Sequence, residues 1–572
     1  MNLRFDSLFV LLLLQASRPA SALSPVTFSS VATRIAEQVM TRTRTVVQAP
    51  PDLLKSGGLA EACRELHRHN GQECPTAKMV AGLELPYDFP QGTYYRNGPG
   101  RFNADDGTSV IHPFDGDGLV TSLRITGKNN EECRKKNAFW TSRFVHTPGY
   151  LKDIESGKMT GRGVFGSMKS GGWFNNVMDI EPKHVANTNV IRWGDHLWAL
   201  WEGGRPFLLD PETLETVDVE YSANNRIQGT FAAHPRKDPS SSHYFNFGVD
   251  DLDPAAGRTK IHYYELDDGE VVSTPTAFTL PGAAMMHDHL VTDNYLLMVW
   301  TSAEFNGLEG LKGLLGLGSF VAAIDITPKT EVLLIPKDIL HSSDDVIDAT
   351  TDPRIKRIPV PYQFNYHLGN GYEKDGKIIF DAIETTDEEF DFCYGSVTDK
   401  KPVWEIMDFD EMEPFAFAQY TIDVENEQYV DKQIITDCGS IEFPVVPTEM
   451  SGKEHQYIYT VASHDPHAET SGTPGTICKW DLENDEMEHF SFRPEEMVGE
   501  PAFVPKIGGE DEDSGYLIVL VNNGMTLTTD VVVLDVEGPG SLSRGPIARS
   551  RLPSYVPGAG LHGRFVRAGK TS

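Results

Sequence analysis

Short runs of β-branched, aromatic and other apolar residues, separated by turns rich in glycine and acidic residues, recur from about residue 83 to residue 567. Such runs are typical of strands, and long stretches with the 3.6-residue period of a helix are scarce. Representative runs span residues 196–201, 295–300, 377–380, 457–461, 516–521 and 531–534, with turn sequences at 115–118, 267–269, 374–376 and 483–485. This pattern predicts an all-β protein.

Hairpins of one kind recur weakly along the chain: a strand, a charged turn and a second strand, as in 199–211, 320–333 and 456–482. Recurrence over so long a stretch favours radial repetition of β-sheets. Seven blades of roughly 70 residues would use the length. We therefore predict one seven-bladed β-propeller over residues 83–567, with an N-terminal extension at 51–82 and a short tail at 568–572.

Residues 303–318 interrupt the strand pattern. Leu308, Leu311 and Leu315 stand at helical spacing, but the glycines between them are too many for a stable isolated helix. The segment is either a loop packed over the core or an apolar lip that touches a membrane or admits an apolar substrate. The second interpretation predicts peripheral membrane contact through residues 308–320, because no internal apolar run reaches the roughly 18 residues of a membrane span.

The first 50 residues have the composition of targeting segments. Arg4 precedes an apolar run at 8–14, and Ala20-Ser21-Ala22 provides a cleavage-like site, which together predict a signal peptide over 1–22. Residues 23–50 are rich in Ser, Thr, Val and Arg, with Glu37 as their only acid, and resemble a transit peptide. A signal peptide followed by a transit peptide is the bipartite address of secondary plastids in algae. We expect plastid delivery, with secretion or an endomembrane lumen as the alternative.

The chain carries a net charge of −33 and has a pI near 4.9. A surface of that sign repels phosphate backbones, so nucleic acid is excluded as a partner. The six cysteines are unevenly spaced and include no Cys-x-x-Cys pair. They therefore indicate neither a disulfide framework nor a cysteine metal site.

Four histidines, His234, His287, His367 and His562, lie far apart in the chain, each where a strand meets a turn. Imidazole is the commonest metal ligand, and four neutral imidazoles without a carboxylate would suit iron, copper, nickel or zinc. Any one of them alone is more often a structural residue. His289, two residues after His287, would share a strand face with it and could compete as a ligand.

The sequence motifs around these histidines resemble those of the carotenoid cleavage oxygenase family from about residue 83 to 567. They are Tyr95-Arg-Asn-Gly-Pro-Gly, His112-Pro-Phe-Asp-Gly-Asp-Gly-Leu, Ala233-His-Pro, Met286-His-Asp, His367-Leu-Gly-Asn-Gly-Tyr-Glu and His562-Gly. The resemblance implies a seven-bladed propeller with loops and helices capping one face. It also implies one axial non-haem Fe(II) per chain on the four histidines, whose intervals of 53, 80 and 195 residues fit one, one and three blades.

The resemblance assigns further residues around that metal. Glu202, Glu442 and Glu500 lie in motifs similar to three motifs of the family. The glutamates of those family motifs hydrogen-bond to the histidine ligands and orient them. Thr188 stands where the family can place a methyl group that shields one open iron position. The chain departs from the family pattern at two positions: His289 stands where an aromatic residue is usual, and Leu561 where Phe is frequent. These differences affect the shape of the channel and leave the ligands unchanged.

The reaction implied by the resemblance is oxidative cleavage of a conjugated double bond. An apolar carotenoid or apocarotenoid and molecular oxygen would give aldehyde or ketone products, which agrees with the absence of a Gly-x-Ser-x-Gly hydrolase motif. Alternatives on the same fold are an isomerase or a stilbene-cleaving oxygenase. A non-catalytic propeller scaffold is a further alternative, whereas a zinc hydrolase would need three ligands, an open position and a general base.

Overall fold

The computed structural model describes residues 57–570 except 128–135, 224, 254–256, 273–274, 284–285, 342–345, 388–400, 408–411 and 559. The expected signal peptide (1–22) and transit peptide (23–50) lie outside the described residues, as do residues 51–56 and 571–572. Those assignments stay predictions.

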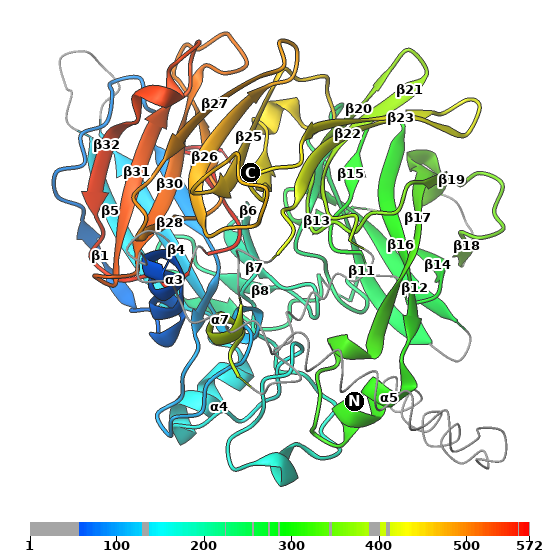
Figure 1. The fold of residues 1–572 in the computed structure, drawn as a ribbon, viewed down its shortest axis with the longest axis horizontal. Helices are drawn as coiled ribbons and strands as arrows, with labels where there is room; N and C mark the ends of the chain where they lie inside the picture. Colours follow the sequence, from blue (N-terminus) through cyan, green and yellow to red (C-terminus); the bar gives the residue numbers. More distant parts are fainter. Residues whose placement is uncertain are drawn as a thin grey trace.

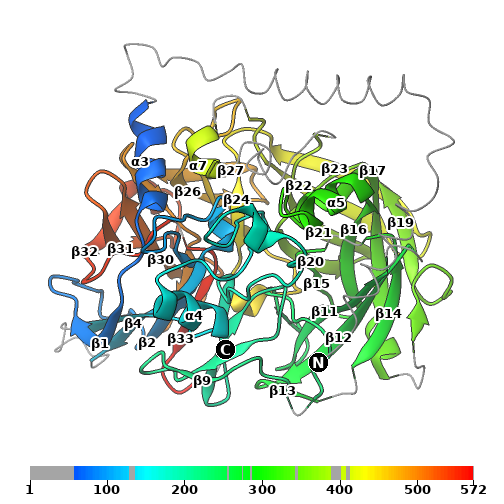
Figure 2. The same cartoon turned by 90° about the horizontal axis from the view of Figure 1, so that it is seen from below.

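Seven β-sheets follow one another along the chain and surround a central region (Figure 2). The first contains β1 (Cys74–Met79), β2 (Gly92–Arg96), β3 (Pro99–Arg101), β4 (Asp117–Thr126), β5 (Asn137–Phe144) and β33 (Gly563–Arg567). The second contains β6 (Asn189–Trp193), β7 (His196–Leu200), β8 (Phe207–Leu209) and β9 (Thr216–Asp218). The third contains β10 (Arg236–Lys237), β11 (Tyr244–Asp253), β12 (Arg258–Asp267), β13 (Glu270–Val271), β14 (Thr276–Pro281) and β18 (Ile347–Asp348).

Four more sheets complete the ring. The fourth contains β15 (Leu290–Val291), β16 (Tyr295–Phe305), β17 (Ile324–Pro336) and β19 (Lys356–Val360), and the fifth β20 (Leu368–Lys374), β21 (Lys377–Glu384), β22 (Ala416–Asp423) and β23 (Gln428–Thr436). The sixth contains β24 (Glu442–Val445), β25 (Tyr457–Ser463), β26 (Pro474–Asp481) and β27 (Glu486–Ser491). The seventh contains β28 (Glu496–Val498), β29 (Ala502–Pro505), β30 (Gly515–Asn523), β31 (Thr528–Asp535) and β32 (Pro546–Arg551). The predicted seven-bladed propeller is confirmed.

Helices gather on one side of the sheets, as the cap expected from the resemblance. Figure 1 shows α4 (Pro148–Ser156), α5 (Gly307–Leu314) and α7 (Val403–Ile406) on the lower side of the molecule, with α3 (Gly57–Arg68) near them. Short 3₁₀ turns connect other elements: η2 (Pro113–Asp115), η3 (Trp173–Asn176), η4 (Val321–Ala323), η5 (Lys337–His341), η6 (Thr448–Met450) and η7 (Leu542–Arg544). Within the described residues, no helix is long and apolar enough to cross a membrane.

The strand runs expected from the sequence lie in strands, except that Trp201 at the end of the run 196–201 forms an isolated bridge with Phe231. Three of the four turn sequences form hairpin turns. Residues 115–118 do not. Asp115 ends η2, and Asp117 begins β4. Asp115 is buried and accepts hydrogen bonds from the backbone N–H of Phe165 (3.0 Å) and Ser167 (3.1 Å). This acidic, glycine-rich motif therefore connects the cap to the first blade and does not form a hairpin turn.

The glycine-rich segment at 303–318, interpreted as a loop or a lip, contains the helix α5. The side chain of Asn306 accepts hydrogen bonds from the N–H groups of Leu308 and Glu309 and so caps the helix. At its other end the buried guanidinium of Arg162 donates to the carbonyls of Gly313 (2.7 Å) and Gly318 (2.9 Å). These contacts offset the low helix propensity of the glycines.

The ring closes between the two ends of the chain. β33 pairs antiparallel with β2, so the first sheet combines N-terminal strands with the last strand of the protein. β1 also belongs to this sheet, which therefore begins before residue 83. A Cβ atom on Gly92 of β2 would lie 2.3 Å from the carbonyl oxygen of Val566 on β33, so glycine is required at this contact.

We predict that Gly92→Ala weakens this closure. The added methyl group must push β2 and β33 apart, at a cost of about 1–3 kcal/mol. The midpoint of thermal unfolding, measured at a fixed scan rate, should fall. Gly307→Ala in the first turn of α5 is the matched control, because nothing lies within 4 Å of its added Cβ. Equal midpoints for the two variants would contradict the prediction.

Candidate metal centre

The four sequence-predicted histidines come together at the centre of the ring. Each lies within three residues of the innermost strand of its sheet: His234 before β10, His287 before β15, His367 before β20 and His562 before β33. These are the third, fourth, fifth and first sheets, as the sequence intervals suggested. One nitrogen from each ring lies within 4.8 Å of the others.

The spacing of these nitrogens fits a single ion. The Nε2 atoms of His234 and His287 are 2.9 Å apart, and those of His367 and His562 are 3.2 Å apart. Two imidazole nitrogens bound at right angles, each about 2.1 Å from a metal, would be about 3.0 Å apart. The four side chains therefore form a cluster that could bind a metal through Nε2.

Three glutamates orient the rings from outside. Nδ1 of His367 donates to Glu442 (2.5 Å), Nδ1 of His562 donates to Glu500 (2.9 Å), and Nδ1 of His287 donates to Glu202. A proton on Nδ1 leaves the Nε2 lone pair directed at the centre. The structure thus brings all three predicted glutamates to the predicted histidines. Among the described residues, no carboxylate pairs with His234.

Burial and neighbouring charges shift the pKa of these groups in different directions. Burial, followed by the other three imidazoles, holds the pKa of His234 well below its ordinary value. Burial also lowers the pKa of His562, although Glu500 opposes it. At His287 burial is outweighed by Glu202, and the pKa is raised. His234 and His562 are therefore kept in the neutral form that binds metals.

Thr188 lies directly beside the cluster. Its backbone carbonyl accepts a hydrogen bond from the N–H of His562 at 3.2 Å. Its hydroxyl donates to the side-chain oxygen of Asn187 at 3.2 Å, and the residue is buried. The shielding role expected for its methyl group stays a prediction.

His289, the competing candidate ligand, lies outside the cluster. Its ring is fully buried, and Nε2 donates to the backbone carbonyl of His234 at 3.1 Å. That donation leaves Nδ1 to accept from the hydroxyl of Tyr263 at 2.9 Å. Burial lowers the pKa of His289 to about 4, so the ring is neutral. It supports the backbone of a candidate ligand rather than acting as one.

Several residues of the site were not assigned from the sequence. The ring of Phe443 stacks on His367, with centroids 5.4 Å apart, and the ring of Tyr366 stands edge-on to His287 at 5.8 Å. Arg236 and Asp288 form an ion pair beside the histidines. Their position in the sequence was the available signal. Arg236, Asp288 and Tyr366 each lie within two residues of a candidate ligand, and Phe443 directly follows the predicted Glu442.

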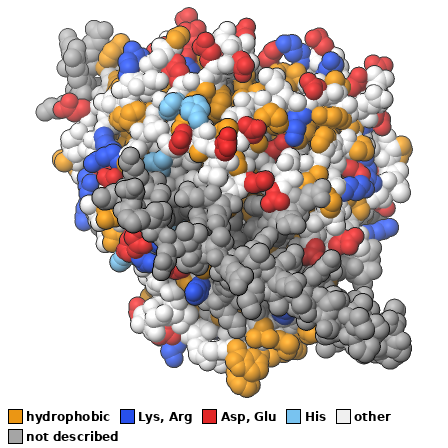
Figure 3. Space-filling view, viewed as in Figure 1, with side chains coloured by type: hydrophobic (Ala, Val, Ile, Leu, Met, Phe, Trp, Pro, Cys, Tyr) orange, Lys and Arg blue, Asp and Glu red, His pale blue; other side chains and the backbone are white. Residues whose placement is uncertain are grey.

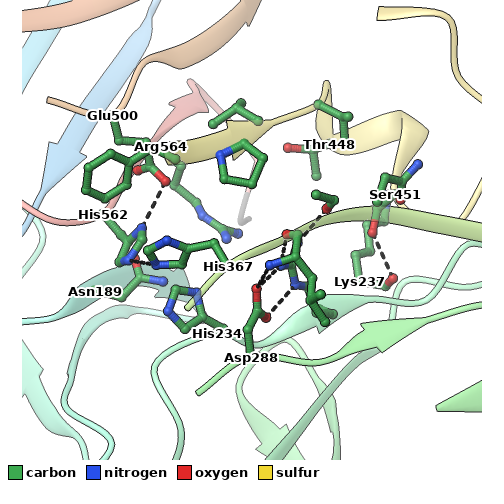
Figure 4. Close-up of a pocket in the computed structure, with 18 of the residues that line it drawn as sticks. Asn189, His234, Lys237, Asp288, His367, Thr448, Ser451, Glu500, His562 and Arg564 are labelled. Carbon is green, nitrogen blue, oxygen red and sulfur yellow. Dashed lines mark hydrogen bonds and ion pairs between the residues drawn. The ribbon is translucent and has the colours of Figure 1, made fainter. Parts of the chain in front are cut away.

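The two sides of the cluster differ in polarity. One side opens on a pocket of about 170 Å³ along the axis, whose lining includes His234, His367 and His562 together with the cationic residues Lys237 and Arg564. Figure 4 shows Arg564 on the same side as the histidines and Lys237 across the pocket from them. On the other side Tyr366, which contacts His287, packs against Val164, Phe165 and Val321 from the cap and against Ile326 of β17. His287 is absent from the polar pocket and is the most exposed of the four.

Comparison with known proteins supports the family resemblance. The apocarotenoid-15,15'-oxygenase of Synechocystis sp. is 34% identical over 493 residues, covering 84% of this chain and 91% of the relative. The chloroplastic carotenoid cleavage dioxygenase 7 of Arabidopsis thaliana is 26% identical over 562 residues, covering 86% of this chain and 87% of the relative. A cobalt-substituted structure named as Synechocystis ACO superposes with a TM-score of 0.75 at 31% identity, covering 89% of this chain and 99% of that one.

The family model described as retinal pigment epithelial membrane protein matches residues 67–567. That span holds all seven sheets and every residue of the candidate centre. The chain therefore belongs to the retinal pigment epithelial membrane protein family, the carotenoid oxygenase family that its motifs resemble.

Proposed function

We propose that this protein is a non-haem Fe(II) dioxygenase that cleaves a conjugated double bond of a carotenoid or apocarotenoid, giving aldehyde or ketone products. The observation that carries the proposal is the cluster of four imidazoles, three of them hydrogen-bonded to glutamates. The relatives named as an apocarotenoid oxygenase and a carotenoid cleavage dioxygenase support the substrate class.

The metal ligands in this proposal are His234, His287, His367 and His562, and one iron is held per chain. Ferrous iron would supply the redox chemistry that activates molecular oxygen. Four neutral ligands leave up to two positions of an octahedron open. Thr188, beside His562, would shield one of them with its methyl group. Glu202, Glu442 and Glu500 would keep the Nε2 lone pairs aimed at the ion, which typically contributes 10–100-fold in metal affinity.

The apolar side of the cluster is the side on which we place the polyene. Carrying an apolar chain into the axial pocket would desolvate Lys237 and Arg564 without giving them a partner. The cap side instead presents Tyr366 and the apolar group around Phe165 and Val321, leading toward His287. No nucleophile or general base is required of the protein, whose residues position the reactants.

We predict that His367→Ala abolishes cleavage and lowers bound iron well below one per chain. The reason is the loss of one of four ligands and of its bond to Glu442. Iron is measured by elemental analysis, and products are identified after incubation with a panel of carotenoids and apocarotenoids. His467→Ala is the matched control, because His467 is exposed and outside the cluster.

Iron-free wild-type protein, or undiminished cleavage by His367→Ala, would contradict this function. Labelled oxygen separates the alternatives that share the fold. A carotenoid dioxygenase places label in aldehyde or ketone products, an isomerase incorporates none, and a stilbene-cleaving enzyme acts on stilbenes in the same panel. A scaffold would bind no iron at all.

We also propose that the cap touches a membrane through α5 and η3. Exposed apolar side chains gather there: Trp173, Phe174, Met178, Leu308, Leu311, Leu315 and Leu317. The two segments are adjacent, since the N–H of Met178 donates to the carbonyl of Leu314 at 2.9 Å. Figure 3 shows exposed hydrophobic side chains grouped at the lower edge of the molecule. The net charge of −33 opposes attraction to anionic lipids, so the contact is hydrophobic.

We predict that Leu311→Glu/Leu315→Glu reduces the fraction of protein that floats with zwitterionic liposomes by about tenfold or more, because two leucines lose a favourable transfer into lipid. Val430→Glu/Ile434→Glu is the control, since both residues are exposed on β23 and outside the α5–η3 surface. Equal flotation of the two variants would rule out the α5–η3 surface as the membrane contact.

For the compartment, we propose delivery to a plastid by residues 1–50, acting as a signal peptide and a transit peptide. The support is their composition, together with the word chloroplastic in the name of one relative. A fluorescent protein carrying residues 1–50 should enter the plastid of an alga with a secondary plastid. A fusion cut at residue 22 should stop in the secretory route, and identical distributions for the two fusions would favour secretion.

A further inference from the structure

Arg236 and Asp288 form an ion pair beside the histidine cluster. Arg236 lies two residues after His234, and Asp288 directly follows His287. Nε of Arg236 donates to Oδ1 of Asp288 at 3.1 Å, while Nη2 donates to Oδ2, so the contact is bidentate. Figure 4 shows Asp288 next to His234 and near His367, with dashed lines marking its polar contacts.

Both partners also reach the segment that follows His367. Arg236 donates to the carbonyls of Leu368 (2.6 Å) and Gly369 (3.2 Å). Oδ2 of Asp288 accepts from the N–H of Leu368 at 2.9 Å. The pair therefore joins backbone next to His234, His287 and His367, which belong to three different sheets.

His289 adds two hydrogen bonds to the same network. Oδ1 of Asp288 accepts from the N–H of His289 at 2.7 Å, and the ring of His289 donates to the carbonyl of His234 at 3.1 Å. Each of these hydrogen bonds thus ends on one of the three segments that carry a candidate ligand.

Stability alone is a poor explanation for this pair. The side chain of Asp288 is fully buried, and that of Arg236 is 22% exposed. Burying an ion pair costs desolvation energy, and apolar residues of similar volume often stabilise a fold equally well. A planar guanidinium bound in a fork, by contrast, fixes distances and angles among the groups that it contacts.

We propose that Arg236 and Asp288 are positioning residues that set the mutual spacing of His234, His287 and His367 before metal binds. The proposal rests on the metal centre of the proposed function and deepens it. Neither side chain contributes a ligand atom to the cluster. They act through the backbone of the ligands, where a displacement of about 0.5 Å is enough to spoil a preorganised site.

The test is titration of the metal-free, full-length protein with Co²⁺, followed by the visible absorption of the bound ion. In Asp288→Asn the amide keeps an oxygen for the N–H of Leu368 but loses the charge that holds the guanidinium fork. The Kd for Co²⁺ should rise by about 10–100-fold, the range for groups that support metal ligands. The absorption spectrum should change as well, because the geometry around the ion changes.

Asp513→Asn is the matched control. Asp513 is buried, pairs with Lys479 at 2.7 Å and accepts from the N–H of Gly538 at 2.9 Å, but none of these residues adjoins a histidine of the cluster. This variant should lower the thermal midpoint of the metal-free protein while leaving the Kd for Co²⁺ and the spectrum unchanged. Arg236→Lys keeps the positive charge but loses the bidentate guanidinium contact, so the Kd for Co²⁺ should rise as it does in Asp288→Asn. If Asp288→Asn fails to fold, the Kd of Arg236→Lys tests the proposal.

Wild-type affinity and an unchanged spectrum in both Asp288→Asn and Arg236→Lys would overturn the inference while leaving the metal centre intact. Wild-type protein that binds no Co²⁺, or binds it equally after His367→Ala, would overturn the metal centre itself. The two failures are therefore distinguishable.

Discussion

Convergence of the innermost strands on one axis is the constraint on which the rest of the molecule depends. Residues up to 328 positions apart, such as His234 and His562, become neighbours only because their sheets share that axis. The pairing of β33 with β2 closes the ring and places His562 opposite residues of the third to fifth sheets. The candidate centre is thus a property of the closed ring rather than of any one blade.

Each of the seven sheets contributes to this centre. The first, third, fourth and fifth supply the histidines, while Glu202, Glu442 and Glu500 come from the second, sixth and seventh. Every glutamate reaches a histidine on a different sheet, so each of these pairs is also a contact between blades. Ligand orientation and blade packing therefore rest partly on the same hydrogen bonds, and a change in one affects the other.

The sequence predicted the architecture and the principal site residues for identifiable reasons. Short apolar runs between glycine-rich and acidic turns mark the strands, and short motifs similar to those of the family mark the four histidines, the three glutamates and Thr188. Tertiary contacts decided what the sequence left open. Arg162 lets a glycine-rich segment form α5, and Tyr263 with the carbonyl of His234 turns His289 away from the cluster. Such contacts join residues far apart in the chain and leave no local pattern.

The charges around the centre explain why two arginines lie so close to a proposed metal. Arg96, buried, donates to the carbonyls of Glu500 (2.7 Å) and Gly560 (3.1 Å), and its charge helps His562 to lower the pKa of Glu500. Arg236 is neutralised by Asp288. The three glutamates place negative charge directly behind the imidazoles that they orient, and this charge favours cation binding at the cluster.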